Sequence, residues 1–144
     1  MPFRLIVPRA IHDAMVVQAL AEQPNECCGL LAGVANEGIA RVVTHYPLVN
    51  ALASPIEYEA EHGSLLAAHR DTWARQIDVL AVYHSHPTSL PVPSRKDMER
   101  SYWEGVVYLI LSLTTSPPSV RGWWLTTTDY REAEWEIESA SECA

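Results

Sequence analysis

The sequence is poor in cysteine, in positive charge and in long apolar stretches, and each shortage excludes a class of protein. Among its 144 residues are 3 cysteines, of which Cys27 and Cys28 are adjacent and Cys143 is far away. This pattern is neither the framework of a disulfide-stabilised secreted domain nor the Cys-x-x-Cys knuckle of a structural zinc site. We therefore predict structural roles for Cys27 and Cys28.

Positive charge is scarce, because 10 lysine and arginine residues stand against 18 acidic residues and give a net charge of −8. Such a balance disfavours a nucleic-acid partner, since phosphate backbones attract clusters of basic side chains. No apolar run approaches the roughly 20 residues that a membrane-spanning helix needs. The first residues, 1–8, are too short and too broken by proline for a signal peptide. We expect no nucleic-acid partner, no membrane insertion and a cytoplasmic location.

What the sequence does contain is the composition of a folded domain, with 48% hydrophobic and 19% charged residues, enough for a proper core. Strands are expected at 3–7, 26–33, 39–47, 78–84, 106–113, 120–127 and 130–137, and long helices at 11–22 and 59–77. The second and third strands are expected to pair as a hairpin, and the last two to end an antiparallel meander. The polar residues 138–144 are predicted to be frayed. This order predicts one α/β domain over residues 1–144, with a mixed, mostly antiparallel sheet flanked by helices.

One segment in the middle of the chain combines histidines, prolines and a carboxylate at spacings that suit a metal site. His84 and His86 follow an apolar strand, and alternating side chains place both on one face. Residues 87–93 hold three prolines, and Ser94 after them is a good N-cap for a short helix with Asp97 in its first turn. Such a helix can return Asp97 to the strand end. His84, His86 and Asp97 thus predict one Zn²⁺ per chain, with a fourth position left for water.

A zinc hydrolase also needs a carboxylate that takes a proton from the attacking water and returns it. We prefer Glu26, which begins an apolar strand followed by Gly29, where the backbone can approach other elements closely. Ser94 lies one helical turn before Asp97 and would face the same cavity, so that its hydroxyl could stabilise an oxyanion formed by the substrate. Glu26 and Ser94 are therefore the predicted catalytic residues.

The same residues allow other interpretations. Two histidines on an edge strand are common without a metal, and we expect four further histidines at the surface or in packing: His12, His45, His62 and His69. A cupin site would need a glutamate within 87–93 and an all-β chain, and the sequence has neither. A zinc nucleoside deaminase would show His-x-Glu and Pro-Cys-x-x-Cys, which are also missing. A non-catalytic interaction module stays open.

These motifs resemble those of the JAMM metalloproteases, also called MPN-plus or JAB/Mov34 domains. Their pattern is a glutamate, then after a long gap His-Ser/Thr-His-Pro, then Ser-x-x-Asp. Glu26 corresponds to the glutamate, residues 84–87 to the histidine motif and residues 94–97 to the end. The numbers of residues that separate His86 from Ser94 and from Asp97 agree with the family. Residues 26–33 also resemble the glutamate-led strand of bacterial members, and the likeness covers nearly the whole chain.

The resemblance implies an MPN-like fold and a role for each motif residue. It implies zinc bound by His84, His86, Asp97 and a water, with Glu26 as general acid and base and Ser94 as stabiliser of the tetrahedral intermediate. Family members hydrolyse peptide or isopeptide bonds, often just after the C-terminus of ubiquitin or a ubiquitin-like protein. Inactive relatives lose metal ligands and act as scaffolds, whereas every motif residue is present here.

The short connections at 48–58 and 98–105 leave no room for the larger insertions of some eukaryotic relatives. The chain therefore resembles the compact bacterial and archaeal members. Some of these process ubiquitin-like sulfur carriers, and this is the substrate class that the resemblance implies. An extended substrate tail could lie as an added strand near the cleft, with glycines passing the narrow approach to zinc.

Overall fold

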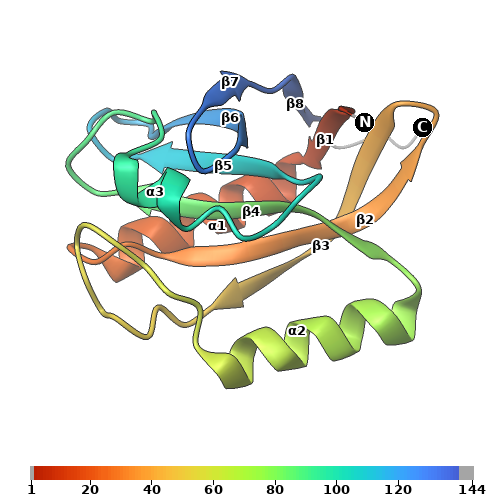
Figure 1. Cartoon of the computed structure of the whole chain (residues 1–144), viewed down its shortest axis with the longest axis horizontal. Helices are drawn as coiled ribbons and strands as arrows, with labels where there is room; N and C mark the ends of the chain where they lie inside the picture. Colours follow the sequence, from red (N-terminus) through yellow and green to blue (C-terminus); the bar gives the residue numbers. More distant parts are fainter. Residues whose placement is uncertain (1, 140–144) are drawn as a thin grey trace.

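The computed structural model describes residues 2–139 and shows a curled sheet with helices packed on it (Figure 1). The helices are α1 (Arg9–Glu22), α2 (His62–Arg75) and α3 (Arg95–Glu99). The strands are β1 (Arg4–Pro8), β2 (Cys28–Asn36), β3 (Ile39–Leu48), β4 (Asp78–His86), β5 (Val107–Ser112), β6 (Ser119–Leu125), β7 (Tyr130–Glu132) and β8 (Trp135–Glu138). No helix within residues 2–139 is long and apolar enough to cross a membrane. The frayed end predicted at 138–144 lies outside the described residues from 140 on, while Glu138 ends β8.

The strands form one eight-stranded sheet in the order β7-β6-β5-β4-β2-β3-β1-β8. Antiparallel pairs join β2 to β3, β2 to β4, β5 to β6 and β6 to β7. Parallel pairs join β1 to β3, β1 to β8 and β4 to β5. The predicted α/β class with a mixed, mostly antiparallel sheet is confirmed, and so is the hairpin, which β2 and β3 form.

The two edge strands, β7 and β8, follow each other directly in the chain, and the curled sheet lets the chain cross from one edge to the other (Figure 1). The Ala133 N–H donates to the Gly122 carbonyl of β6 at 2.8 Å, and the Leu5 N–H of β1 donates to the Glu134 carbonyl at 3.1 Å. The predicted antiparallel strand over 130–137 is therefore confirmed for 130–132, which form β7 against β6, and is wrong for the rest. Ala133 is buried in the core and interrupts it, and β8 pairs in parallel with β1.

Helix α2 is shorter than the helix predicted over 59–77, because both of its ends are set by local hydrogen bonds. The Glu61 carboxylate accepts bonds from the N–H groups of Gly63 at 2.9 Å and Ser64 at 2.7 Å, which caps the first turn. At the other end Gln76 adopts the left-handed conformation with φ 56°, and its N–H bonds to the last turn. The helix therefore begins after Glu61 and ends before Gln76.

Apolar side chains cover both faces of the sheet and form two clusters. On one face Met15 of α1 packs among buried residues that include Tyr83 and Leu109. On the other face Ala68 of α2 packs in a cluster with Val82. Successive side chains of a strand point to opposite faces, so Val82 and the even-numbered residues that follow it in β4 lie on the α2 face.

The adjacent cysteines are buried at the start of β2. Cys27 and Cys28 are free thiols with exposures of 0% and 1%. Burial raises the pKa of both thiols to about 12, so they stay protonated and unreactive near neutral pH. This environment agrees with the structural role predicted for both.

Candidate metal centre and active site

The end of β4 presents two buried imidazoles on the α2 face of the sheet. β4 is a central strand between β2 and β5, and its apolar sequence suits burial on both faces. His84 is 0% exposed and His86 is 3% exposed. In the sheet His84 lies opposite Cys28 of β2 on one side and Ile110 of β5 on the other. Hydrogen-bonded neighbours on both sides therefore fix the backbone that carries the histidines.

The proline-containing segment 87–93 turns the chain back over this strand end and is held by three hydrogen bonds to its carbonyls. His86 Nδ1 bonds to the Leu90 carbonyl at 2.8 Å, the Trp123 indole donates to the Pro91 carbonyl at 2.9 Å, and the Ser112 hydroxyl donates to the Ser89 carbonyl at 2.6 Å. These contacts place α3, which follows the segment, beside β4 (Figure 1).

Asp97 is presented by the first turn of α3 through a reciprocal cap. The Ser94 hydroxyl accepts the Asp97 N–H at 3.1 Å, and the Asp97 carboxylate accepts the Ser94 N–H at 2.9 Å. This capping box fixes the carboxylate toward β4. Ser94 was predicted as an N-cap from sequence, and that prediction is confirmed.

The three side chains converge on one point. Asp97 Oδ1 lies 3.1 Å from His84 Nε2, Asp97 Oδ2 lies 3.0 Å from His86 Nε2, and the two Nε2 atoms are 3.2 Å apart. All three residues are buried, and together they can hold a metal ion. Because His86 Nδ1 donates to the Leu90 carbonyl, the proton that Nε2 shares with Asp97 is the one that a bound metal ion would displace, which would leave the Nε2 lone pair at the shared point.

Asp97 is in the deprotonated state that a metal ligand needs. Burial alone would raise the pKa of its carboxyl group, but the charge of His84 and hydrogen bonds from His84, His86 and the Ser94 N–H hold this pKa well below its usual range. Asp97 is therefore an ionised carboxylate among imidazoles, which is the state that binds a cation.

Glu26 lies in the same region, just before the first residue of β2. The strand predicted from Glu26 begins two residues later, at Cys28. Ser85, between the two histidines, ties this end to β4: its hydroxyl accepts the Cys27 N–H at 2.8 Å, and its own N–H donates to the Cys27 carbonyl at 3.1 Å. Glu26 therefore precedes a residue that is locked onto the histidine strand.

The Glu26 carboxylate is 3% exposed, and its Oε1 has no hydrogen-bond partner among residues 2–139. Burial raises its pKa to about 7; the charges of His84 and His86 lower the pKa, and those of Asp97 and Glu57 raise it. These effects show that Glu26 senses the charges of all three members of the histidine–aspartate group. A buried carboxyl group with a pKa near neutrality can exchange protons readily.

Asn50 holds the backbone around Glu26, a role that the sequence did not predict. Its Nδ2 donates to the carbonyls of Glu26 and Glu57, each at 3.1 Å, and its Oδ1 accepts the N–H groups of Leu52 at 3.0 Å and Glu59 at 3.1 Å. The amide thus uses both donors and both acceptor positions. Nothing in the local sequence separates this asparagine from an ordinary loop residue, because its partners depend on how the loop folds.

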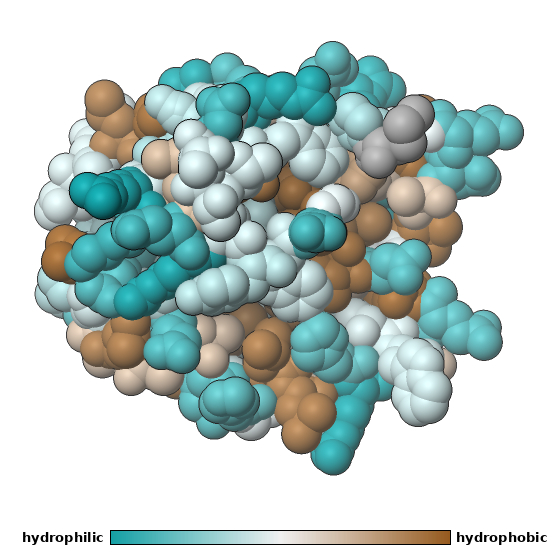
Figure 2. All heavy atoms as spheres, in the orientation of Figure 1, coloured by the Kyte–Doolittle hydropathy of each residue, from teal (hydrophilic) through white to brown (hydrophobic). Residues whose placement is uncertain are grey.

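The loop between β3 and α2 also covers a metal-binding candidate directly. The Tyr58 ring stacks on the His84 imidazole, with 4.7 Å between centroids and 27° between planes. Glu57, beside it, pairs with Lys96 at 2.7 Å and Arg100 at 2.9 Å. These ion pairs join the loop to α3, over which strongly hydrophilic side chains gather in Figure 2.

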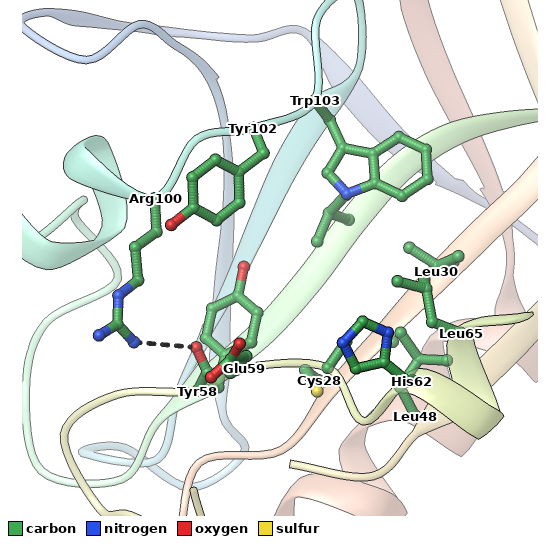
Figure 3. A pocket seen from close by; sticks show the side chains of 13 residues that line it. Cys28, Leu30, Leu48, Tyr58, Glu59, His62, Leu65, Arg100, Tyr102 and Trp103 are labelled. Carbon is green, nitrogen blue, oxygen red and sulfur yellow. Dashed lines mark hydrogen bonds between the residues drawn. The ribbon is translucent and has the colours of Figure 1, made fainter. Parts of the chain in front are cut away.

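Figure 3 shows a pocket of about 310 Å³, and one of its lining residues, Tyr58, also stacks on His84. It is lined by residues of β2, β3, the β3–α2 loop, α2, β4 and the segment after α3: Cys28, Gly29, Leu30, Leu48, Tyr58, Glu59, Ala60, His62, Leu65, Val82, Arg100, Tyr102 and Trp103. The sequence analysis had not identified this pocket, whose walls come from five distant stretches of chain.

The fold and this histidine–aspartate group define a domain of the JAB type. A family model described as prokaryotic homologs of the JAB domain matches residues 8–126. The chain belongs to this family, which confirms the JAMM resemblance seen in the motifs.

Two relatives and one solved structure show how far the likeness extends. A desampylase of Haloferax volcanii is 41% identical over 96 residues, covering 65% of this chain and 67% of the relative. A CysO-cysteine peptidase of Mycobacterium tuberculosis is 32% identical over 108 residues, covering 75% of this chain and 73% of the relative. The solution structure of a Desulfitobacterium hafniense protein superposes with a TM-score of 0.86 at 27% identity, covering 96% of this chain and 95% of the other.

Proposed function

We propose that this chain is a zinc metallopeptidase that hydrolyses a peptide or isopeptide bond at the C-terminal tail of a ubiquitin-like or sulfur-carrier protein. The observation that carries the proposal is the buried Glu26 carboxylate beside the convergent His84, His86 and Asp97 side chains. A buried general base next to a three-ligand group is the constellation that metal-assisted hydrolysis requires.

The ligand spacing fits zinc. In a tetrahedral zinc site with bonds of about 2.0–2.1 Å, neighbouring ligand atoms lie about 3.3 Å apart. The two histidine Nε2 atoms are 3.2 Å apart, and each lies within 3.1 Å of one oxygen of the Asp97 carboxylate, Oδ1 for His84 and Oδ2 for His86. These residues would hold one Zn²⁺ per chain and leave one position open. Zinc there would supply a Lewis acid and would lower the pKa of a coordinated water to about 7.

In this proposal Glu26 moves the proton and Ser94 stabilises charge. Glu26 takes a proton from the attacking water and delivers it to the leaving amine, and its raised pKa suits both steps. The Ser94 oxygen accepts the Asp97 N–H, so its own hydroxyl proton is free to be donated to the oxyanion that forms at the scissile carbonyl.

The substrate class rests on the relatives and on the small size of the loops. The names of the relatives denote enzymes that act on ubiquitin-like or sulfur-carrier proteins. The β3–α2 loop and the α3–β5 connection are short, which suits a narrow extended tail. The net charge of −8 supports a protein substrate over a nucleic acid. The free thiols Cys27 and Cys28 suit the reducing cytoplasm, where we place the enzyme. The scaffold alternative gains no support, because every motif residue is present.

The test is hydrolysis of the host's small diglycine-ended ubiquitin-like proteins carrying C-terminal extensions, with the products weighed by mass spectrometry. Wild type should release the extension, and a chelator should stop the reaction. Glu26→Gln keeps the shape of the side chain but cannot accept the proton, so hydrolysis should fall by about 10²–10⁴-fold while elemental analysis still finds one zinc per chain. A wild type that cleaves none of these fusions, or a Glu26→Gln variant with full activity, contradicts the proposal.

A further inference from the structure

The two histidines of the metal centre are held in different ways. His86 Nδ1 donates to the Leu90 carbonyl at 2.8 Å, which fixes the plane of that imidazole from the side away from the shared point. His84 Nδ1 is buried and has no hydrogen-bond partner within residues 2–139. A histidine that binds a metal through Nε2 is ordinarily oriented by a hydrogen bond at Nδ1, so a different contact has to orient His84.

The orientation of the His84 ring decides which atom it offers to the metal. The last torsion of a histidine side chain is broad and roughly two-fold, and half a turn about it puts Cε1 in the place of Nε2. The 3.1 Å contact between His84 Nε2 and Asp97 Oδ1 opposes this turn, but it is the contact that a bound metal ion would displace. A restraint that serves the site with and without metal therefore acts elsewhere on the ring.

Tyr58 covers one face of the His84 imidazole. The two ring centroids are 4.7 Å apart and the ring planes differ by 27°, which is the geometry of an offset stack. Rotation of the imidazole about its last torsion would drive the edge of the imidazole into the tyrosine ring. The stack therefore keeps the imidazole plane in place without using either of its nitrogens.

The backbone on both sides of Tyr58 is fixed, so its ring is a firm support. Arg100 donates to the Tyr58 carbonyl at 3.4 Å (Figure 3) and pairs with the Glu57 carboxylate at 2.9 Å. On the other side the Glu59 N–H donates to Asn50 Oδ1 at 3.1 Å. The loop residue that touches the metal centre is thus tied both to the segment after α3 and to the residue that holds Glu26.

We propose that Tyr58 is a positioning residue of the metal centre, whose ring does for His84 what the Leu90 hydrogen bond does for His86. It keeps His84 Nε2 directed at the point that all three ligands share. This inference rests on the metal site of the proposed function and adds to it a residue outside the recognised motif.

The first test is the zinc affinity of the full chain, measured in competition with a chromophoric chelator. Tyr58→Ala removes the ring, and zinc should bind about 10-fold more weakly, since losing a group that orients a metal ligand has effects of this size. Tyr58→Phe keeps the flat ring and should bind zinc as wild type does. Tyr58→Leu keeps much of the bulk without a planar face and should resemble the alanine variant.

A matched control changes another tyrosine of the same pocket. Tyr102 also lines the pocket but is 78% exposed, so Tyr102→Ala should leave the zinc affinity unchanged.

The second test observes the His84 ring itself in the metal-free chain by long-range ¹H–¹⁵N NMR. Wild type and Tyr58→Phe should give one sharp set of His84 ring signals, whereas Tyr58→Ala should give a second or broadened set. The His86 signals should stay single in every variant, because the Leu90 carbonyl still holds that ring. A tyrosine that merely stabilised the loop would change the urea midpoint without producing this difference between the two histidines.

Four results would overturn the inference: wild-type zinc affinity in Tyr58→Ala, wild-type affinity in Tyr58→Leu, a loss in Tyr58→Phe as large as that in Tyr58→Ala, or one sharp set of His84 signals in Tyr58→Ala. Each of these leaves the proposed function standing, because wild type still binds zinc. A wild type that binds no zinc instead removes the proposed metal site, and this inference with it.

Discussion

The position of Glu26 depends on residues that lie outside the recognised motif. Its N–H donates to the Ser54 carbonyl at 2.8 Å, and its carbonyl accepts the Asn50 side chain at 3.1 Å. Both partners belong to the β3–α2 loop, so Glu26, the proposed general base, is held by that loop as well as by its place before β2. Ser85 supplies the link to β4. A proton-transfer group must stay within hydrogen-bond reach of the water that it activates, so we expect these backbone bonds to matter for rate.

Asn50→Asp tests this dependence. The substitution keeps the shape and the acceptor oxygen of Asn50 but removes the donors to the carbonyls of Glu26 and Glu57. Each buried acceptor left without a donor costs about 1–3 kcal/mol, so for the two carbonyls urea unfolding should show a loss of about 2–6 kcal/mol. We expect kcat to fall about 10-fold with KM and zinc content little changed. Asn36→Asp at the exposed end of β2 is the control. Loss of stability without any fall in kcat would limit Asn50 to a purely structural role.

Ser94 has two tasks that substitution can separate. Its hydroxyl caps α3 through the Asp97 N–H and is also the proposed oxyanion donor. Ser94→Ala and Ser94→Gly both remove the donor, but glycine is tolerated as an N-cap at a cost of only a few tenths of a kcal/mol, whereas alanine costs about 1 kcal/mol. Both variants should lose about 10²-fold in kcat, with zinc retained. If alanine alone lowered kcat, the effect would come from the cap and the oxyanion role would be wrong.

At the scale of elements, signals that are local in sequence predicted well. The apolar run before His84 marks β4, and the serine–aspartate spacing marks α3 with its cap. Pairings between distant segments could not be read in the same way. β8 leaves the expected meander because its partner, β1, lies at the other end of the chain. The partners of Asn50 and the walls of the pocket are set by the same kind of long-range packing, which no short pattern encodes.

The end of α2 offers a prediction about an element boundary. Gln76 takes the left-handed conformation with φ 56°, which costs a residue with a Cβ roughly 1–2 kcal/mol. Glycine adopts it freely but loses more chain entropy on folding. Gln76→Gly should therefore raise the free energy of unfolding by about 0.5–1 kcal/mol, measured by urea titration. Glycine at Ala67, an exposed position within α2, should instead lower it by about 1 kcal/mol. A destabilised Gln76→Gly variant would show that the glutamine side chain outweighs its backbone strain.

At the scale of the whole molecule, the curled sheet brings together groups that are far apart in sequence. The antiparallel register places Cys28 opposite His84, so the residues just before β2 lie beside the end of β4. The segment 87–93 then folds α3 over the same end. The sequence alone predicted that Glu26, His84, His86 and Asp97 would act together, and the register of β2 against β4 explains how Glu26 comes near the other three.

The metal would therefore connect two elements, β4 and α3, that otherwise meet through few contacts. A ligand that binds only the folded state stabilises it by about 4 kcal/mol at 1,000 times its dissociation constant. For a domain of this size 1 kcal/mol corresponds to roughly 2–4 °C, so chelation should lower the Tm by on the order of 10 °C in a thermal melt, and added zinc should restore it. His86→Ala should have the lower Tm already and should not respond to the chelator, because two remaining ligands bind zinc poorly. His45→Ala, away from the cluster, should respond as wild type does. A wild-type Tm that the chelator leaves unchanged would show that no bound metal joins β4 to α3.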